Sequence, residues 1–324
     1  MPPDRKKKEF FPPNRNAAIN HTVVIGDLFK NDRAKIESLF ETTPWPGSIE
    51  ALAASIAGAP EPQKPLFVYL NHGAKYQPGL PSPELASRSF DFFEKAAALW
   101  KALPSASLIT LPVSKELIME SGIDFQGHTE ELFELYGQKG FMCMYHPKMP
   151  VIPLTNHIAL KRVPAAMKKI DTEVLYRSLL FFRELFKPKL PFAMTGVNPH
   201  AGEGGRIGTE ESDLNEVLIK LATRGQVVEG PFPADGLFTR ANRNKYGLFI
   251  TAYHDQGLIP FKALIGTAGV NTTLNLPRLR VSPDHGPAYD FAGKDTADIQ
   301  SVLKSMQFAM TWGKKWITQY KSLF

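Results

Sequence analysis

Three histidines each follow a short apolar stretch of the sequence. His157 stands in PLTNHIAL, His200 in GVNPHAG and His254 in ITAYHDQG. Neutral imidazole is a common ligand of zinc and related divalent ions, and three such ligands leave a coordination position open for a substrate. The gaps of 43 and 54 residues (200 − 157 and 254 − 200) match no local metal-binding motif. Spacing alone therefore favours three unrelated strand-end histidines bonded to backbone groups over a shared metal site.

Glycines surround His200 in the segment NPHAGEGGRIGTEE (198–211). Residues without Cβ let backbone N–H groups approach a ligand closely, and a helix expected from about Thr209 would present its N-terminus to an anion. The segment has neither the Walker motif nor the GxGxxG spacing of dinucleotide sites. Glu210 and Glu211 are typical first-turn acids of a helix. Taken alone, a structural turn explains this segment at least as well as a ligand cradle.

Other polar residues near these segments could bind an anion. An Arg or Lys that converges with the histidines would bind a phosphate or a carboxylate, although each alone is more often a solvated surface residue. The candidates stand in VSKEL (Lys115), GHTEEL (His128 and Thr129), HDQGLIPFK (Lys262) and GVNTTLNLPRLRVSPDHG (Asn271, Arg278, Arg280, Asp284 and His285).

Charge and composition limit the partners of this chain. The 324 residues carry a net charge of +6, with 43% hydrophobic and 22% charged residues, as in ordinary globular proteins. Arg and Lys are scattered, without a basic helix or a basic-aromatic stripe, so a small anion is favoured over nucleic acid or a membrane surface. No apolar run approaches the roughly 20 residues that cross a bilayer. The basic start (1–16) has no apolar segment after it, so we expect a solvated tail rather than a secretory signal.

A single cysteine, Cys143, excludes an intramolecular disulfide framework and fits a reducing cytoplasm. Its neighbours in FMCMYH predict a buried strand thiol without a partner base. We therefore expect a cytoplasmic protein in which this thiol is not a nucleophile.

Short apolar runs alternate with segments of helical periodicity. Strands are predicted at 21–28, 65–70, 191–196 and around FMCMY, VIPL and GLFITAYHDQG, the last ending in a polar turn. Helices are predicted in DRAKIESLFETT and SIEALAASIAG, over 81–103 with Ser82 as N-cap and Pro83 in the first turn, from about Thr129, over 171–186 and at the C-terminus. This alternation predicts an α/β fold with a largely parallel sheet, whose strand ends would carry the site.

Taken together and in this order, the motifs resemble the 4-hydroxythreonine-4-phosphate dehydrogenase (PdxA) family of vitamin B6 biosynthesis. The matching segments, which span about 112–298, are PVSK, GHTE, TNHIALKRVP, GVNPHAGEGGRIGTEE, GPFPADGLF, YHDQGLIPFK and GVNTTLNLPRLRVSPDHG. NPHAGEGG and YHDQG in one chain form a highly specific combination. The resemblance is thus far stronger than any single motif.

The resemblance implies a two-lobed α/β fold like that of isocitrate and isopropylmalate dehydrogenases, with a cleft between the lobes. We expect 1–122 plus 288–324 to form one lobe and 123–287 the other. The family binds a divalent metal (Zn, Co, Mg or Mn) through three histidines, here His157, His200 and His254. The site lies at a homodimer interface, and we assign His254 to the partner. Next to that metal, the glycines of 198–211 are interpreted as clearance for a ligand.

Substrate contacts of the family correspond to His128, Thr129, Lys262, Asn271 and Arg280. The implied reaction is NAD-dependent oxidation and decarboxylation of 4-phosphohydroxy-L-threonine, with Lys262 and His254 as catalytic residues and Lys262 as a proton relay. Residues that bind NAD are not indicated, because the sequence has no standard dinucleotide fingerprint.

The chain departs from the family near its N-terminus, where VVIGDLFKNDRAKIE replaces a segment of the form GEPAGIGPE. Only Gly26 and Asp27 resemble it. Two alternatives therefore stay open: a dehydrogenase of another phosphorylated hydroxy acid, such as a phosphothreonate or phosphoerythronate, and a non-catalytic relative that has lost NAD binding.

Overall fold

The computed structural model describes residues 23–26, 33–58, 66–70, 77–294, 296 and 298–324. The chain forms two compact units, Met1–Gly73 and Ala74–Phe324. The two lobes expected from the resemblance, 1–122 plus 288–324 and 123–287, are a different division of the chain, and that division stays a prediction. None of the described helices is long and apolar enough to cross a membrane.

The first unit contains a parallel three-stranded sheet in the order β1-β3-β2. Its strands are β1 (Val23–Gly26), β2 (Glu41–Pro44) and β3 (Leu66–Tyr69), and its helices are α1 (Arg33–Leu39) and α2 (Ile49–Gly58). Both predicted strands are confirmed, but the end of the predicted helix DRAKIESLFETT is strand β2, because β-branched threonines favour extended backbone. Residues 27–32 of the divergent N-terminal segment lie outside the described residues.

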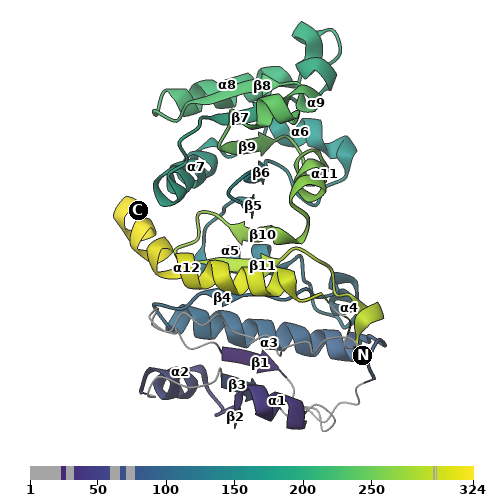
Figure 1. Cartoon of the computed structure of the whole chain (residues 1–324), viewed down its shortest axis with the longest axis vertical. Helices are drawn as coiled ribbons and strands as arrows, with labels where there is room; N and C mark the ends of the chain where they lie inside the picture. Colours follow the sequence, from purple (N-terminus) through teal and green to yellow (C-terminus); the bar gives the residue numbers. More distant parts are fainter. Residues whose placement is uncertain (1–22, 27–32, 59–65, 71–76, 295, 297) are drawn as a thin grey trace, which may run out of the picture. The chain divides into compact units, whose positions relative to one another are not determined.

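The second unit is built on an eight-stranded sheet in the order β4-β11-β10-β5-β6-β9-β7-β8 (Figure 1). Its strands are β4 (Leu108–Ile109), β5 (Met142–Tyr145), β6 (Val151–Pro153), β7 (Phe192–Thr195), β8 (Val228–Phe232), β9 (Leu248–Thr251), β10 (Val270–Thr273) and β11 (Arg280–Pro283).

This sheet is rich in parallel pairs, as expected, but it also contains antiparallel pairs near its middle. Strands β6, β9, β7 and β8 run parallel, but β10 is antiparallel to both β5 and β11, and β5 is antiparallel to β6. The connection from β10 to β11 covers only 274–279, and so short a segment can join antiparallel strands but cannot form the crossover that parallel strands need. The expected parallel pairing therefore holds at both ends of the sheet, since β4 also pairs parallel with β11, and the antiparallel pairs lie between them.

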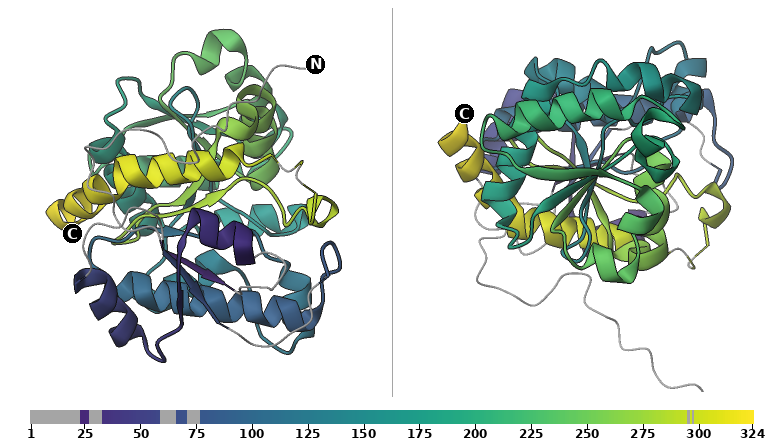
Figure 2. Two further views of the ribbon diagram at one scale, coloured as in Figure 1. Left: turned by 60° about the horizontal axis from the view of Figure 1, so that its bottom comes forward. Right: turned by 90° about the horizontal axis from the view of Figure 1, so that it is seen from above.

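Helices cover both faces of this sheet (Figure 2). Ser82 caps α3 by accepting a hydrogen bond from the Leu85 N–H, and Pro83 is its first residue, which confirms both predictions. The helices are α3 (Pro83–Ala102), α4 (Lys115–Glu120), α5 (His128–Tyr136), α6 (Val163–Met167), α7 (Thr172–Phe186), α8 (Glu211–Ala222), α9 (Ala234–Leu237), α10 (Arg240–Arg243), α11 (His254–Ile265) and α12 (Gln300–Leu323), with short 3-10 turns η1 (Leu160–Arg162), η2 (Pro199–Gly205), η3 (Gly266–Ala268) and η4 (Tyr289–Phe291).

Successive residues of the strands face two separate hydrophobic clusters. In β9, Ile250 packs in a cluster with α7 and α8, whereas Phe249 packs on the opposite face with Leu258 and Phe261 of α11. Side chains alternate between the two faces of a strand, so a sheet covered on both sides needs continuous apolar runs. Cys143 is fully buried in the first of these clusters, and burial raises the pKa of its thiol. The prediction of a buried thiol in a strand is confirmed.

The polar turn predicted after β9 is the start of a helix. Helix α11 begins at His254 and contains both Gly257 and Pro260, two residues that weaken a helical pattern in a sequence. A Cβ at Gly257 would lie 2.6 Å from Val151 Cγ1, so the glycine lets α11 pack closely on β6. The consequence for the site is that one helix carries both His254 and Lys262.

Candidate active site

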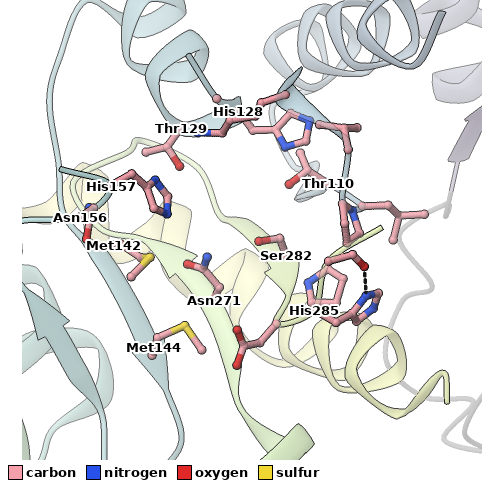
Figure 3. Close-up of a pocket in the computed structure, with 18 of the residues that line it drawn as sticks. Thr110, His128, Thr129, Met142, Met144, Asn156, His157, Asn271, Ser282 and His285 are labelled. Atoms are coloured by element: carbon pink, nitrogen blue, oxygen red, sulfur yellow. Dashed lines mark hydrogen bonds between the residues drawn. The ribbon is translucent and has the colours of Figure 1, made fainter. Parts of the chain in front are cut away.

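A cavity of about 350 Å³ opens in the second unit above strands β5, β10 and β11 (Figure 3). Asn271 of β10 lies between its register partners Met144 of β5 and Ser282 of β11, and all three line the cavity. The cavity brings together seven of the eight site residues that the resemblance implies: His128, Thr129, His157, His254, Lys262, Asn271 and Arg280.

Two histidines of the cavity lining lie close together. The ring centroids of His157 and His254 lie 5.5 Å apart. Asp255 Oδ1 lies 2.7 Å from His254 Nδ1, an arrangement in which Nδ1–H donates and Nε2 is left as a ligand atom. Burial, and then the nearby Lys115 and His254, lower the pKa of His157, which favours the neutral imidazole that a metal requires.

His200 is not among the residues that line the cavity. Within the described residues of this single chain, no group of three His, Cys, Asp or Glu side chains could hold a metal ion. One chain thus supplies two of the three expected ligands, His157 and His254, in one place. The assignment of His254 to the partner subunit stays a prediction, and the structure adds that His157 and His254 lie close together within one chain.

The segment around His200 is a left-handed turn. Residues 200–205 all have positive φ, with values of 52° at His200, 48° at Ala201 and 45° at Glu203. Each non-glycine residue in this region costs about 1 kcal/mol or more, so surrounding contacts must hold the turn. The His200 side chain is exposed on it.

Glu211 supplies these contacts. Its side chain is buried, and Oε1 accepts hydrogen bonds from the backbone N–H groups of Val197 (2.9 Å) and Asn198 (2.8 Å). A Cβ at Gly202 would lie 2.4 Å from Glu211 Oε2, and one at Gly208 would lie 2.2 Å from Asn198 Nδ2. Glycines 202 and 208 therefore make room for side chains of the same loop, not for a ligand as expected, and Glu211 is more than a first-turn acid.

A buried guanidinium also lines the cavity. Arg280 is 4% exposed, and its nitrogens donate to the hydroxyls of Thr110 (2.7 and 3.1 Å), Thr129 (3.3 Å) and Thr273 (3.3 Å). Burial lowers its pKa to about 10, and the nearby Glu130 partly opposes that shift. Among the described residues no carboxylate forms a salt bridge with it, so the charge is solvated only by neutral hydroxyls. Such a cation favours an anionic ligand.

His128 lies beside this guanidinium in an aromatic environment. Its ring centroid is 4.6 Å from that of Phe93 and 5.4 Å from that of Phe125. Burial, and then the charges of Arg280 and Lys115, lower its pKa to about 3. At neutral pH His128 is therefore an uncharged imidazole, which can donate one hydrogen bond and accept another.

The N-terminus of α5 also lines the cavity. Its N-cap is Gly127 with φ 146°, and no side chain caps the helix. A Cβ there would lie 2.8 Å from Lys115 Nζ and 2.6 Å from Glu130 Oε2, so only glycine lets these two charged groups approach the helix start. Uncapped N–H groups, Lys115 and Arg280 together favour an anionic ligand beside this helix start.

Two asparagines of the cavity carry buried oxygens without a partner. Neither Asn156 Oδ1 nor Asn271 Oδ1 has a hydrogen-bond partner among the described residues. Buried acceptors are normally satisfied, so these two favour a ligand that carries donors such as hydroxyl or amino groups. Sequence reasoning missed Asn156 as a site residue, although its position next to His157 is the signal that could have found it.

Comparisons with known proteins place the chain near one family. The family model described as "Pyridoxal phosphate biosynthetic protein PdxA" matches residues 21–309. A 4-hydroxythreonine-4-phosphate dehydrogenase of Paracoccus denitrificans is 39% identical over 247 residues, covering 73% of this chain and 76% of that protein. A D-threonate 4-phosphate dehydrogenase of Cupriavidus necator is 38% identical over 242 residues, covering 71% of each.

Solved structures resemble the chain as well. The crystal structure of a 4-hydroxythreonine-4-phosphate dehydrogenase from Klebsiella pneumoniae superposes with a TM-score of 0.70 at 30% identity, covering 89% of this chain and 87% of that one. The family model spans most of the chain, and the relatives share more than a third of their aligned residues with it. On this evidence the chain belongs to the PdxA family.

Proposed function

We propose that this chain oxidises a small phosphorylated hydroxy acid with NAD as hydride acceptor and a divalent metal, and that carbon dioxide is lost from the product. The first candidate substrate is 4-phosphohydroxy-L-threonine, the substrate in the names of several relatives. The observation that carries the proposal is the cavity itself, which combines a histidine pair with a buried guanidinium that has no carboxylate partner among the described residues.

The residues around Arg280 suit the phosphate of such a substrate. Arg280 supplies fixed donors, Thr129 and the N-terminus of α5 supply more, and Lys115 adds a second positive charge. His128 is neutral, so it can donate to a phosphate oxygen and adds no charge to the site. A phosphate bound here would fix the register of the substrate in the cavity.

The histidine pair, His157 and His254, suits a divalent metal. His157 and His254 would hold the ion, with Asp255 orienting the ring of His254. When bound, such an ion acts as a Lewis acid that acidifies a coordinated hydroxyl and stabilises negative charge on oxygen. Zn, Co, Mg and Mn remain the candidates, and two imidazoles from this chain favour the first two over Mg.

The third ligand is proposed to come from a second copy of the chain. His200 is exposed on the left-handed turn that Glu211 stabilises. Apolar residues near the three histidines in the sequence are exposed too: Ile158 (41%), Ile207 (46%) and Ile259 (67%). Exposed apolar side chains at a functional surface are typical of an interface. A symmetric homodimer would place the His200 of each copy at the cavity of the other.

The remaining chemistry needs a group that handles protons near the substrate. Lys262 lines the cavity from α11, and its ammonium can neutralise a carboxylate or give a proton to the carbon that carbon dioxide leaves. The unpaired oxygens of Asn156 and Asn271 would accept hydrogen bonds from the hydroxyl or amino group of the substrate. These contacts would hold the substrate in one orientation in the cavity.

Phosphorylated hydroxy acids without an amino group are a second candidate class, because one relative is named a D-threonate 4-phosphate dehydrogenase. The test is a panel of 4-phosphohydroxy-L-threonine, D-threonate 4-phosphate and D-erythronate 4-phosphate, assayed by NADH absorbance with each divalent ion. Turnover of the first substrate with the highest kcat/KM supports the proposal, and a preference for either of the others assigns the second class.

Calorimetry with NAD addresses the non-catalytic alternative. No NAD binding with any substrate and metal, together with intact binding of the phosphorylated acid, would overturn the proposal in favour of a binding protein. His254→Ala is the matched negative control, since it removes a proposed metal ligand and leaves the residues around Arg280 unchanged.

A further inference from the structure

A salt bridge stands at the edge of the cavity, between residues from two different elements. Lys262 Nζ of α11 lies 3.0 Å from Oδ1 of Asp284, which follows β11. The two partners differ in exposure, with 51% for the Lys262 side chain and 13% for that of Asp284. The aspartate is thus the enclosed member of the pair and the lysine the exposed one.

Asp284 is also held through its backbone. Its N–H donates to Ser301 Oγ at 2.9 Å, and Ser301 is a buried residue in the first turn of α12. Helix α12 packs along β10 and β11, so Asp284 is anchored to the body of the unit. Lys262, by contrast, has a long side chain with several rotatable bonds and loses entropy when it is fixed.

The charge of Asp284 conflicts with the ligand of the cavity. A carboxylate that lines a site for a phosphorylated acid repels that acid, and the repulsion is strong where water is scarce. An aspartate in such a place needs a compensating role. The salt bridge supplies one, because it cancels the charge of Asp284 and draws the Lys262 ammonium toward the cavity.

We infer that Asp284 is a positioning residue, which holds the ammonium of Lys262 at the cavity so that it meets the substrate without a search through rotamers. The inference rests on the proposed function, which gives Lys262 a substrate to contact. Two other readings of the salt bridge predict different results. An ordinary surface ion pair contributes little, so its loss would change nothing. A purely repulsive carboxylate would weaken binding, so its removal would improve the enzyme.

The experiment is a double-mutant cycle with Asp284→Asn, Lys262→Met and the double variant. Turnover of 4-phosphohydroxy-L-threonine gives kcat/KM, and calorimetric binding of the same compound is the second readout where turnover is slow. Asp284→Asn alone is expected to lower kcat/KM about tenfold or more, chiefly through kcat. In the Lys262→Met background the same substitution should cause no loss and a slight gain in affinity, because it then removes only an unpaired carboxylate.

Controls separate this role from stability and from the proposed function. Asp290→Asn changes a neighbouring exposed aspartate that does not line the cavity, and it should behave like the wild type. Ser301→Ala should lower kcat in the same direction as Asp284→Asn but by less, with both variants folded by circular dichroism, and it carries the test if Asp284→Asn folds poorly.

The outcomes are distinct. An active wild type whose Asp284→Asn variant equals or exceeds it overturns the inference, as does an equal loss in both backgrounds. A wild type that turns over none of the phosphorylated acids contradicts the proposed function instead.

Discussion

The carboxylate of Glu211 accepts hydrogen bonds from both the backbone and the side chain of Asn198, at 2.8 Å from the N–H and 3.0 Å from Nδ2. These bonds tie the end of β7 to the start of α8 and close the left-handed turn that carries His200. A buried charge therefore controls where an exposed histidine stands.

Replacing Glu211 by Ala is expected to destabilise the fold by about 2 to 3 kcal/mol, because buried N–H groups lose a charged acceptor. Glu211→Gln, which keeps a carbonyl oxygen, should cost about 1 kcal/mol. Urea unfolding measures both values, with the exposed Glu203→Gln as control. Equal stability of Glu211→Ala and the control would show that the turn does not depend on this carboxylate.

Mixing two inactive variants tests which histidine crosses the dimer interface. If His157 and His254 come from one chain and His200 from the other, a heterodimer of His157→Ala and His200→Ala keeps one intact site. Random exchange at equal amounts should then restore about a quarter of wild-type activity, since about half the dimers are mixed and each has one working site. His157→Ala mixed with His254→Ala should restore nothing. The reverse pattern would return His254 to the partner.

The low pKa of His128 predicts a pH dependence of stability. Its folded-state pKa is about 3 against 6.5 for the free group. Below pH 6.5, therefore, His128 binds a proton in the unfolded chain but stays unprotonated in the folded chain until about pH 3. This group should weaken the fold progressively from pH 6.5 down to about 3, by roughly 2 kcal/mol at pH 5. Urea unfolding at pH 7 and pH 5 should show a smaller loss for His128→Gln than for the wild type. Parallel losses would mean that His128 titrates normally.

Arg280→Lys tests the proposal that Arg280 binds the phosphate of the substrate. An ammonium cannot reach the hydroxyls of Thr110, Thr129 and Thr273 together, so the substrate phosphate should lose its fixed donors. The expected result is a ten- to hundredfold rise in KM with a smaller change in kcat, which corresponds to about 1.5 to 3 kcal/mol for a charge-assisted hydrogen bond. Arg240→Lys, on the exposed helix α10, is the control. An unchanged KM would place the phosphate elsewhere.

Much of the fold follows from local patterns in the sequence. Apolar runs predicted β5, β7 and β9, and Ser82 with Pro83 predicted the start of α3, because strand and cap signals are short-range. Helix α11 was missed because Gly257 and Pro260 mask its periodicity. The antiparallel place of β10 depends on which strands pair, and pairing is not a local property of a sequence.

Site residues that belong to sequence motifs could be predicted, whereas roles that depend on contacts in three dimensions could not. His128, Thr129, Lys262, Asn271 and Arg280 were identified by resemblance, and the structure brings them to one cavity. The role of Glu211 was not visible, since a buried acceptor and a first-turn acid look alike in a sequence. Nor does a sequence state which copy of a chain supplies a ligand, so the assignment of His254 to the partner stays a prediction, against which we propose His200 because His254 lies near His157 in one chain.

The left-handed turn at 200–205 has a consequence for assembly. Its backbone already occupies an unfavourable conformation, held by contacts within its own loop, before any second chain arrives. Binding that orders a flexible segment loses affinity to the entropy of ordering, whereas a rigid epitope does not. A second copy that docks on this loop would meet a preformed surface. The hydrogen bonds of Glu211 within the loop would then determine both the affinity between subunits and the position of His200 as a metal ligand.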